Sequence, residues 1–121
     1  MKTIQINKEV LHNIYGGCAE SMKEVFSEFL NTFATIRQNL LSSYLSGSFD
    51  SLKRSLHHHG PSFMYLGMPY ISESFKELEK QCLGDPDPCL ISDNFSNLIQ
   101  LVDESKAHVV HEMEHLIQAG Q

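Results

Sequence analysis

Apolar side chains recur at alternating steps of four and three residues through most of this chain, and this spacing limits its fold more than any other feature. It runs from Met22 to Leu40, from Leu52 to Leu66, from Ile71 to Cys82 and from Phe95 to Leu116. Residues spaced in this way lie on one face of an α-helix. Because no stretch shows the alternation typical of a β-strand, the sequence predicts an all-α protein.

Residues that stop or start helices separate these segments. They are Gly16, Gly17, Gly47 and Gly84, which suit helix ends, and Pro69 and Pro88, which suit first helical positions. A short helix from Asn7 to Tyr15 precedes the four long ones. Because short loops make sequence neighbours pack together, we predict an antiparallel four-helix bundle with a short extra N-terminal helix. The length suits a single domain over residues 1–121.

The helix predicted between Leu52 and Gly67 presents His57 to solvent. At about 100° per residue, His57 points roughly 140° away from the centre of the apolar stripe. Gly60 and Pro61 follow it, although glycine and proline disfavour a helix interior by about 1 and 3 kcal/mol. The simplest hypothesis is that a partner must come close to the imidazole, so that bulk beside it has been removed.

The residues around His57 resemble the signature of histidine-containing phosphotransfer (HPt) domains. That signature has a phosphorylatable His, usually a Lys three residues later, a small residue or Pro next, then Ser or Thr, and Gly at the tenth position. The corresponding residues are Gly60, Pro61, Ser62 and Gly67, and the match continues in register at Gly47, Ser48, Phe49, Ile71, Leu78 and Glu79. The resemblance spans roughly residues 7–117, and its main departure is Gly60 in place of Lys.

The resemblance implies a phosphorelay phosphocarrier. Such a domain accepts a phosphoryl group on the distal ring nitrogen of its histidine, here His57, from a receiver-domain aspartyl phosphate and passes it to another receiver aspartate. An exposed imidazole is mostly neutral at pH 7 and then has the nucleophilic lone pair that this step needs. Other site residues are expected to serve in docking or charge stabilisation (Lys53, Arg54, Gly60, Pro61 and Met64) or in the helix structure of the site (Ser62 and Gly67).

By the same resemblance, the partners are response-regulator receiver domains and a hybrid histidine kinase. The receiver supplies Mg²⁺, so this chain needs no cofactor of its own. Docking is expected on the His57 face and on outward residues of the preceding helix, which include Glu24, Ser27, Asn31 and Gln38. The sequence has no Gly-rich phosphate loop for ATP. We therefore expect a monomeric relay component that is not an enzyme.

Composition and charge exclude several other classes. The net charge of −6 argues against a nucleic-acid binder. No window approaches the roughly 20 apolar residues of a membrane span, and the N-terminus lacks the apolar core of a signal peptide. We therefore expect a cytoplasmic protein without membrane contact. Cys18, Cys82 and Cys89 form no CxxC pair and are expected to be reduced, packed thiols, with a Cys82–Cys89 bridge as the alternative.

Two other functions remain as alternatives. Residues 111–115 fit the HExxH pattern, in which two histidines bind zinc and the glutamate acts as a base. His108 lies one turn before His111 and His115, so the three could form a surface zinc site. This reading is weaker because a catalytic zinc also needs a cleft. The other alternative is a bundle that still docks receivers but has lost phosphotransfer, as the missing Lys could suggest.

The run of three histidines does not itself predict a metal site. Successive helical residues diverge by about 100°, so His57, His58 and His59 cannot close on one ion. His59 falls in the apolar stripe, where the resembled family usually has Leu. We therefore expect His59 to be a hydrogen-bonded core histidine, and the sequence assigns no role to His58.

Overall fold

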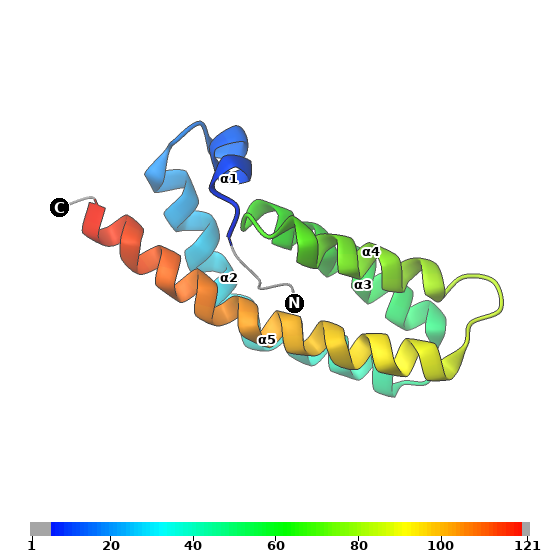
Figure 1. Cartoon of the computed structure of the whole chain (residues 1–121). Coiled ribbons are helices and arrows are strands. Elements are labelled where there is room, and N and C mark those ends of the chain that lie inside the picture. Colours follow the sequence, from blue (N-terminus) through cyan, green and yellow to red (C-terminus); the bar gives the residue numbers. More distant parts are fainter. Residues whose placement is uncertain (1–5, 120–121) are drawn as a thin grey trace.

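The computed structural model describes residues 6–119, and every regular element in this range is an α-helix (Figure 1). The helices are α1 (Lys8–Tyr15), α2 (Ala19–Leu45), α3 (Phe49–Tyr65), α4 (Pro69–Gln81) and α5 (Pro88–Ala119). The predicted all-α class, with four long helices after a short one, is confirmed. None of the helices between residues 6 and 119 combines the length and apolar character that a membrane span requires.

The four long helices form a bundle in which each packs on its neighbours in sequence. The helix α5 then returns to pack on α2, while the diagonal pairs α2 with α4 and α3 with α5 have no Cα atoms within 8 Å of each other in the described residues. The most extensive packing joins α3 and α4. In Figure 1, α2 and α5 extend past this pair, and α1 lies at the end of α3, where it packs on α2 and α3.

Polar side chains cap three helices where the sequence predicts helix starts. The Asn7 side chain accepts a hydrogen bond from the Val10 amide at 3.1 Å. Ser48 accepts one from Ser51 at 3.2 Å at the start of α3, and Asp87 accepts one from Cys89 at 3.0 Å at the start of α5. Each cap satisfies an amide that has no partner within its helix.

Aromatic rings tie α3 to both of its neighbours. The Phe63 ring is fully buried and lies 5.6 Å from the Phe29 ring of α2 and 5.1 Å from the Phe75 ring of α4, between centroids. Each such ring pair stabilises the fold by about 0.5–1.5 kcal/mol beyond the contribution of its buried apolar area. This packing fixes the rotation of α3 about its own axis and therefore which of its residues face solvent.

Gly67, just after the end of α3, makes the contacts that join this end of the helix to α1. Its backbone is left-handed, with φ of 77°, and an added Cβ would lie 2.9 Å from the Leu11 side chain. Its carbonyl accepts a hydrogen bond from the Asn7 amide at 2.7 Å. Glycine suits this position because other residues resist positive φ. The expected structural role of Gly67 therefore has a clear physical basis.

His59 is buried, as the sequence predicts, but its expected hydrogen bond is absent from the described part of the chain. Its ring instead meets the His58 ring edge-on, with centroids 4.8 Å apart. Burial lowers the pKa of His59, and the neighbouring charge of His58 lowers it further. The folded protein therefore favours neutral His59.

Replacing His59 with Leu should reduce the acid sensitivity of the fold. A depressed folded pKa means that the neutral form contributes fully above about pH 6.5 and that this contribution is lost as pH falls through the folded pKa. Urea unfolding between pH 7.5 and 5.0 should thus show a smaller loss of stability for His59→Leu than for wild type. Parallel pH curves would contradict this, and His12→Gln, at an exposed histidine on α1, is the matched control.

Candidate functional site

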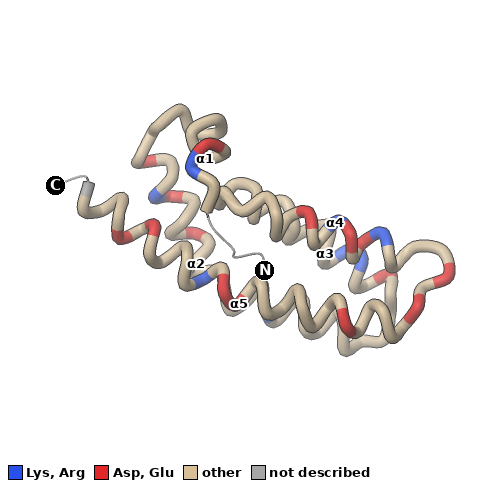
Figure 2. Tube along the Cα trace, in the orientation of Figure 1, with Lys and Arg blue, Asp and Glu red and all other residues tan. Residues whose placement is uncertain are grey.

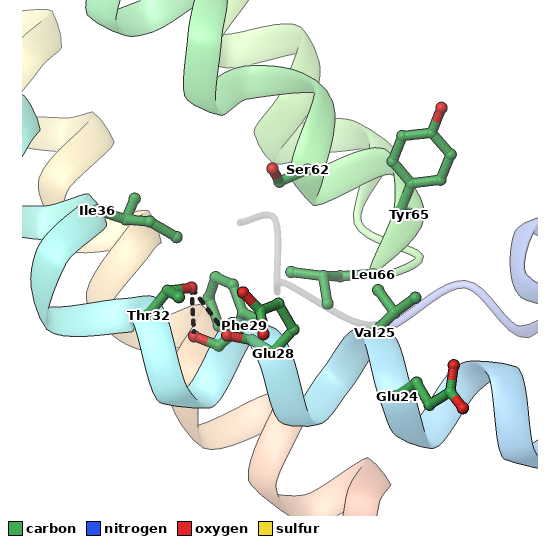
Figure 3. A pocket seen from close by; sticks show the side chains of 9 residues that line it. All are labelled: Glu24, Val25, Glu28, Phe29, Thr32, Ile36, Ser62, Tyr65 and Leu66. Atoms are coloured by element: carbon green, nitrogen blue, oxygen red, sulfur yellow. Dashed lines mark hydrogen bonds between the residues drawn. The ribbon is translucent and has the colours of Figure 1, made fainter.

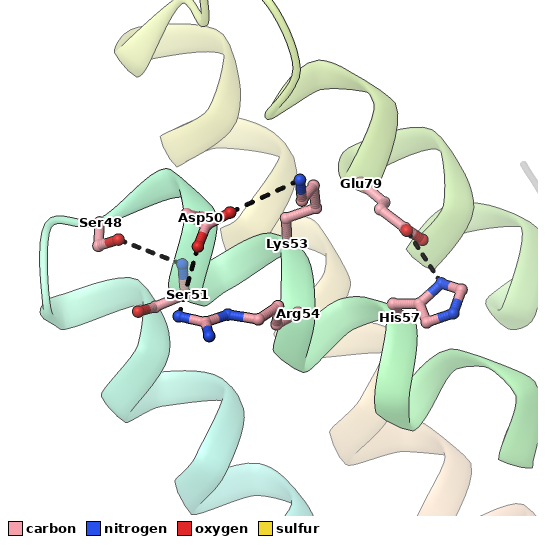
Figure 4. Close-up of polar contacts among 7 residues, drawn as sticks. All are labelled: Ser48, Asp50, Ser51, Lys53, Arg54, His57 and Glu79. Atoms are coloured by element: carbon pink, nitrogen blue, oxygen red, sulfur yellow. Dashed lines mark hydrogen bonds and ion pairs between the residues drawn. The ribbon is translucent and has the colours of Figure 1, made fainter.

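His57 stands on the outer face of α3, where its side chain is 79% exposed. This orientation follows from Leu56 and Phe63, which are fully buried on the other side of the helix. Its Nδ1 atom lies 3.0 Å from Oε1 of Glu79 on α4 (Figure 4). The Glu79 side chain is 25% exposed, so this contact is partly shielded from water.

The Glu79 contact controls which ring nitrogen of His57 is reactive. A carboxylate only accepts hydrogen bonds, so it favours the tautomer in which Nδ1 carries the proton and donates it to Glu79. The lone pair is then on Nε2, the nitrogen without a protein partner among residues 6–119. The site thus holds an exposed, oriented nucleophile.

Gly60 packs closely against α4, and it also lines the depression beside His57. Gly60 is buried, and a Cβ built on it would lie 2.9 Å from Cβ of Phe75 on α4. Because the obstacle is the root of the Phe75 side chain, rotation of Phe75 cannot remove it. The glycine permits close packing of α3 on α4, and it has no side chain with which to stabilise a charge.

The two predicted cations of α3 are engaged elsewhere. Lys53 Nζ and Arg54 Nη2 lie 3.6 Å and 3.4 Å from the two carboxylate oxygens of Asp50. Figure 4 shows both side chains directed toward Asp50, away from the His57 ring. Lys53 and Arg54 therefore lie near the site, but they make no contact with His57.

The other predicted site residues are distributed along α3. Pro61 is exposed and lines a shallow depression of about 70 Å³ together with His57 and Glu79. Met64 is half-buried two turns after His57, and exposed Ser62 lies toward α2. The pairing of His57 with Glu79 was missed from sequence, where Glu79 appeared only as part of a match after Leu78.

A larger apolar groove of about 340 Å³ lies between α2 and α3 (Figure 3). Its lining comprises Glu24, Val25, Glu28, Phe29, Thr32, Ile36, Ser62, Tyr65 and Leu66. Of the outward α2 residues expected to dock a partner, Glu24 lines this groove. Ser27 and Asn31 line a separate depression, and Gln38 donates a hydrogen bond to Ser42 at 3.1 Å.

The HExxH residues do not form a three-ligand site. The Nε2 atoms of His111 and His115 approach to 3.1 Å, yet no group of three or more metal-ligating side chains occurs within residues 6–119. Glu112, the base in the zinc reading, is buried and pairs with Lys8 of α1. Since Glu112 is held by Lys8, the structure gives the zinc-hydrolase alternative no support.

The three cysteines are free thiols, as expected, but the expectation that all three are packed is wrong. Cys82 is buried, whereas Cys18 and Cys89 are exposed. Burial raises the pKa of Cys82, which keeps that thiol protonated and unreactive. The alternative bridge between Cys82 and Cys89 is not formed.

Comparison of the chain with protein-family models, with curated proteins and with solved structures finds no match in any of the three. The functional argument therefore depends on the geometry around His57.

Substitution of Gly60 should destabilise the bundle even where it improves helix propensity. The higher helix propensity of alanine should stabilise Gly60→Ala by up to about 1 kcal/mol. The added methyl group, however, must fit into a packed interface, which typically costs about 1–3 kcal/mol. We expect a net loss of about 1 kcal/mol in urea unfolding, and a larger loss for Gly60→Lys. His58→Ala, at an exposed position of the same helix, should show no loss. A more stable Gly60→Ala protein would contradict the close packing.

Proposed function

We propose that this protein is a phosphorelay phosphocarrier of the HPt kind, with His57 as the phosphoryl acceptor and donor. The observation that carries the proposal is the exposed His57 ring, whose Nδ1 faces Glu79 while Nε2 remains open to solvent. The all-α bundle and the sequence pattern around His57 add support. The chain acts as a carrier, and its partners supply the Mg²⁺ and the aspartates.

The forward step begins with the neutral His57 ring. Its Nε2 lone pair attacks the phosphorus of a receiver aspartyl phosphate, a P–N bond forms, and the P–O bond to the aspartate breaks. The aspartate leaves as a carboxylate, and the ring becomes a phosphoimidazolium whose Nδ1–H still donates to Glu79. Because the proton stays on Nδ1, this step needs no separate base.

The return step uses the same proton arrangement. A second receiver aspartate attacks the phosphorus, the P–N bond breaks, and the electron pair returns to Nε2 as neutral imidazole leaves. Because Nδ1 keeps its proton in the hydrogen bond to Glu79, the ring leaves as neutral imidazole and not as imidazolate, which is the poorer leaving group. The contact between His57 and Glu79 thus supports transfer in both directions.

The groove between α2 and α3 is the docking surface in this proposal. Val25, Phe29 and Leu66 contribute apolar surface to it, and it borders the helix that carries His57. An apolar helix face of a receiver domain suits such a groove, since helix-in-groove contacts are a common recognition mode. Docking here would bring the receiver to α3, from which its active site would extend over the exposed His57 ring.

The experiment that tests the carrier function is chemical phosphorylation. Phosphoramidate is the donor: His57 Nε2 attacks its phosphorus, the P–N bond breaks, and ammonia leaves. Intact mass should show one acid-labile phosphoryl group on wild type and none on His57→Gln, with His58→Gln as the matched control. Equal labelling of His57→Gln, or no labelling of wild type, would refute the assignment. Receiver binding without labelling would indicate the docking bundle that has lost phosphotransfer.

A substitution in the groove should separate docking from chemistry. Val25→Glu places a charge in the apolar groove, and loss of a central interface contact typically costs 1–2 kcal/mol or more. Transfer from a panel of receiver domains phosphorylated with acetyl phosphate should become roughly tenfold slower or more, whereas phosphoramidate labelling stays unchanged. Asn31→Glu, an exposed change outside the groove, is the control. Because Asn31 was itself expected to take part in docking, Gln100→Glu, an exposed change on α5, is the second control and should leave transfer unaltered. Unaltered receiver transfer in Val25→Glu would place docking elsewhere.

A further inference from the structure

A phosphoryl group on His57 needs a nearby positive charge. It would bring nearly two negative charges to a ring whose other nitrogen already faces the Glu79 carboxylate. Like charges at this range repel, so the site requires a cation close to Nε2. This requirement rests on the proposed phosphocarrier function.

The position three residues after His57 cannot supply that charge. Residue 60 is a glycine, and Cβ of Phe75 closes the space in front of it at 2.9 Å. The cations one turn before His57 are held by Asp50, at 3.6 Å from Lys53 and 3.4 Å from Arg54. Cations near His57 that no carboxylate engages among residues 6–119 lie on another element, α4.

The helix α4 carries two lysines, Lys76 and Lys80, which differ in their position relative to His57. Figure 2 shows the basic residues of α3 and α4 on the half of this helix pair that leads to the α4–α5 loop. Lys76 lines the depression that contains His57, Pro61 and Glu79, whereas Lys80 does not. Both lysines are exposed, and neither makes an ion pair within residues 6–119.

We propose that Lys76 of α4 is the cation that binds the phosphoryl group on His57. Lys76 lies one turn before Glu79 on the same side of α4, and both line the depression beside the His57 ring. A lysine ammonium on a flexible four-carbon stem reaches a phosphoryl oxygen from there without rearrangement of the helices. Lys76 takes no proton in the reaction and acts by neutralising charge.

The close approach of α3 and α4 explains why the cation lies on α4. Contact between Gly60 and Phe75 excludes a side chain from α3 at this level and brings the outer edge of α4 to His57. The same close approach of the helices places Glu79 within hydrogen-bond distance of Nδ1 of His57. The helix α4 thus supplies both the hydrogen-bond acceptor that orients the His57 ring and the cation that neutralises the charge of the phosphoryl group.

The test compares rates of phosphoramidate labelling in full-length protein. Lys76→Met keeps the length of the side chain but removes its charge, and Lys80→Met is the matched control. We expect labelling about fivefold slower in Lys76→Met, the wild-type rate in Lys80→Met, and recovery in Lys76→Arg. The deficit should shrink in 1 M salt, because salt screens an exposed charge. Equal rates for Lys76→Met and Lys80→Met would overturn the proposal.

A double-mutant cycle excludes an indirect effect through Glu79. In a Glu79→Gln background, a lysine that acts on the phosphoryl group keeps its effect, whereas one that only orients Glu79 loses it. Persistence of the deficit supports the assignment, and its disappearance refutes it. Labelled wild type with an unaffected Lys76→Met overturns the lysine assignment alone. Unlabelled wild type overturns the phosphocarrier function and this inference with it.

Discussion

The contact between Gly60 of α3 and Phe75 of α4 is the constraint on which the candidate site depends. Any side chain at residue 60 would overlap Cβ of Phe75, so the glycine sets how close the two helices come. The Phe75 ring then stacks on Phe63 at 5.1 Å, and Glu79, one turn later on α4, reaches His57. Tertiary packing therefore outweighs the roughly 1 kcal/mol by which glycine disfavours a helix.

The proposed chemistry places opposite electrostatic demands on one ring. Glu79 orients His57 by accepting a hydrogen bond from Nδ1, but the same carboxylate repels a phosphoryl group. The ring separates these effects, since Nδ1 faces the carboxylate while Nε2 faces solvent. A flexible cation at the edge of α4 would balance the phosphoryl charge without disturbing the contact that fixes the tautomer.

Local sequence patterns predict the helices but not the contacts between them. Apolar spacing and capping residues such as Asn7 and Ser48 act within a few residues, so helix starts and the exposure of His57 follow from sequence alone. Periodicity also placed Gly60 on the flank of the exposed face. Whether that flank meets water or α4 depends on the distance between helices, which Phe75 sets from fifteen residues away. The same limit hid the burial of Glu112, which depends on where α1 packs.

The short helix α1 is held to the bundle by four attachments. They are the Asn7–Gly67 hydrogen bond, the hydrogen bond that the Tyr15 hydroxyl donates to the Tyr65 carbonyl, the burial of Leu11 and the pairing of Lys8 with Glu112. Such a small unit can open without unfolding the rest, so its amides are expected to exchange hydrogen fastest. Gly67 lies nearly three turns of helix beyond His57, and the Phe63 ring cluster stands between them. Detachment of α1 would therefore leave the ring contacts between α3 and its neighbours in place, and with them the position of His57.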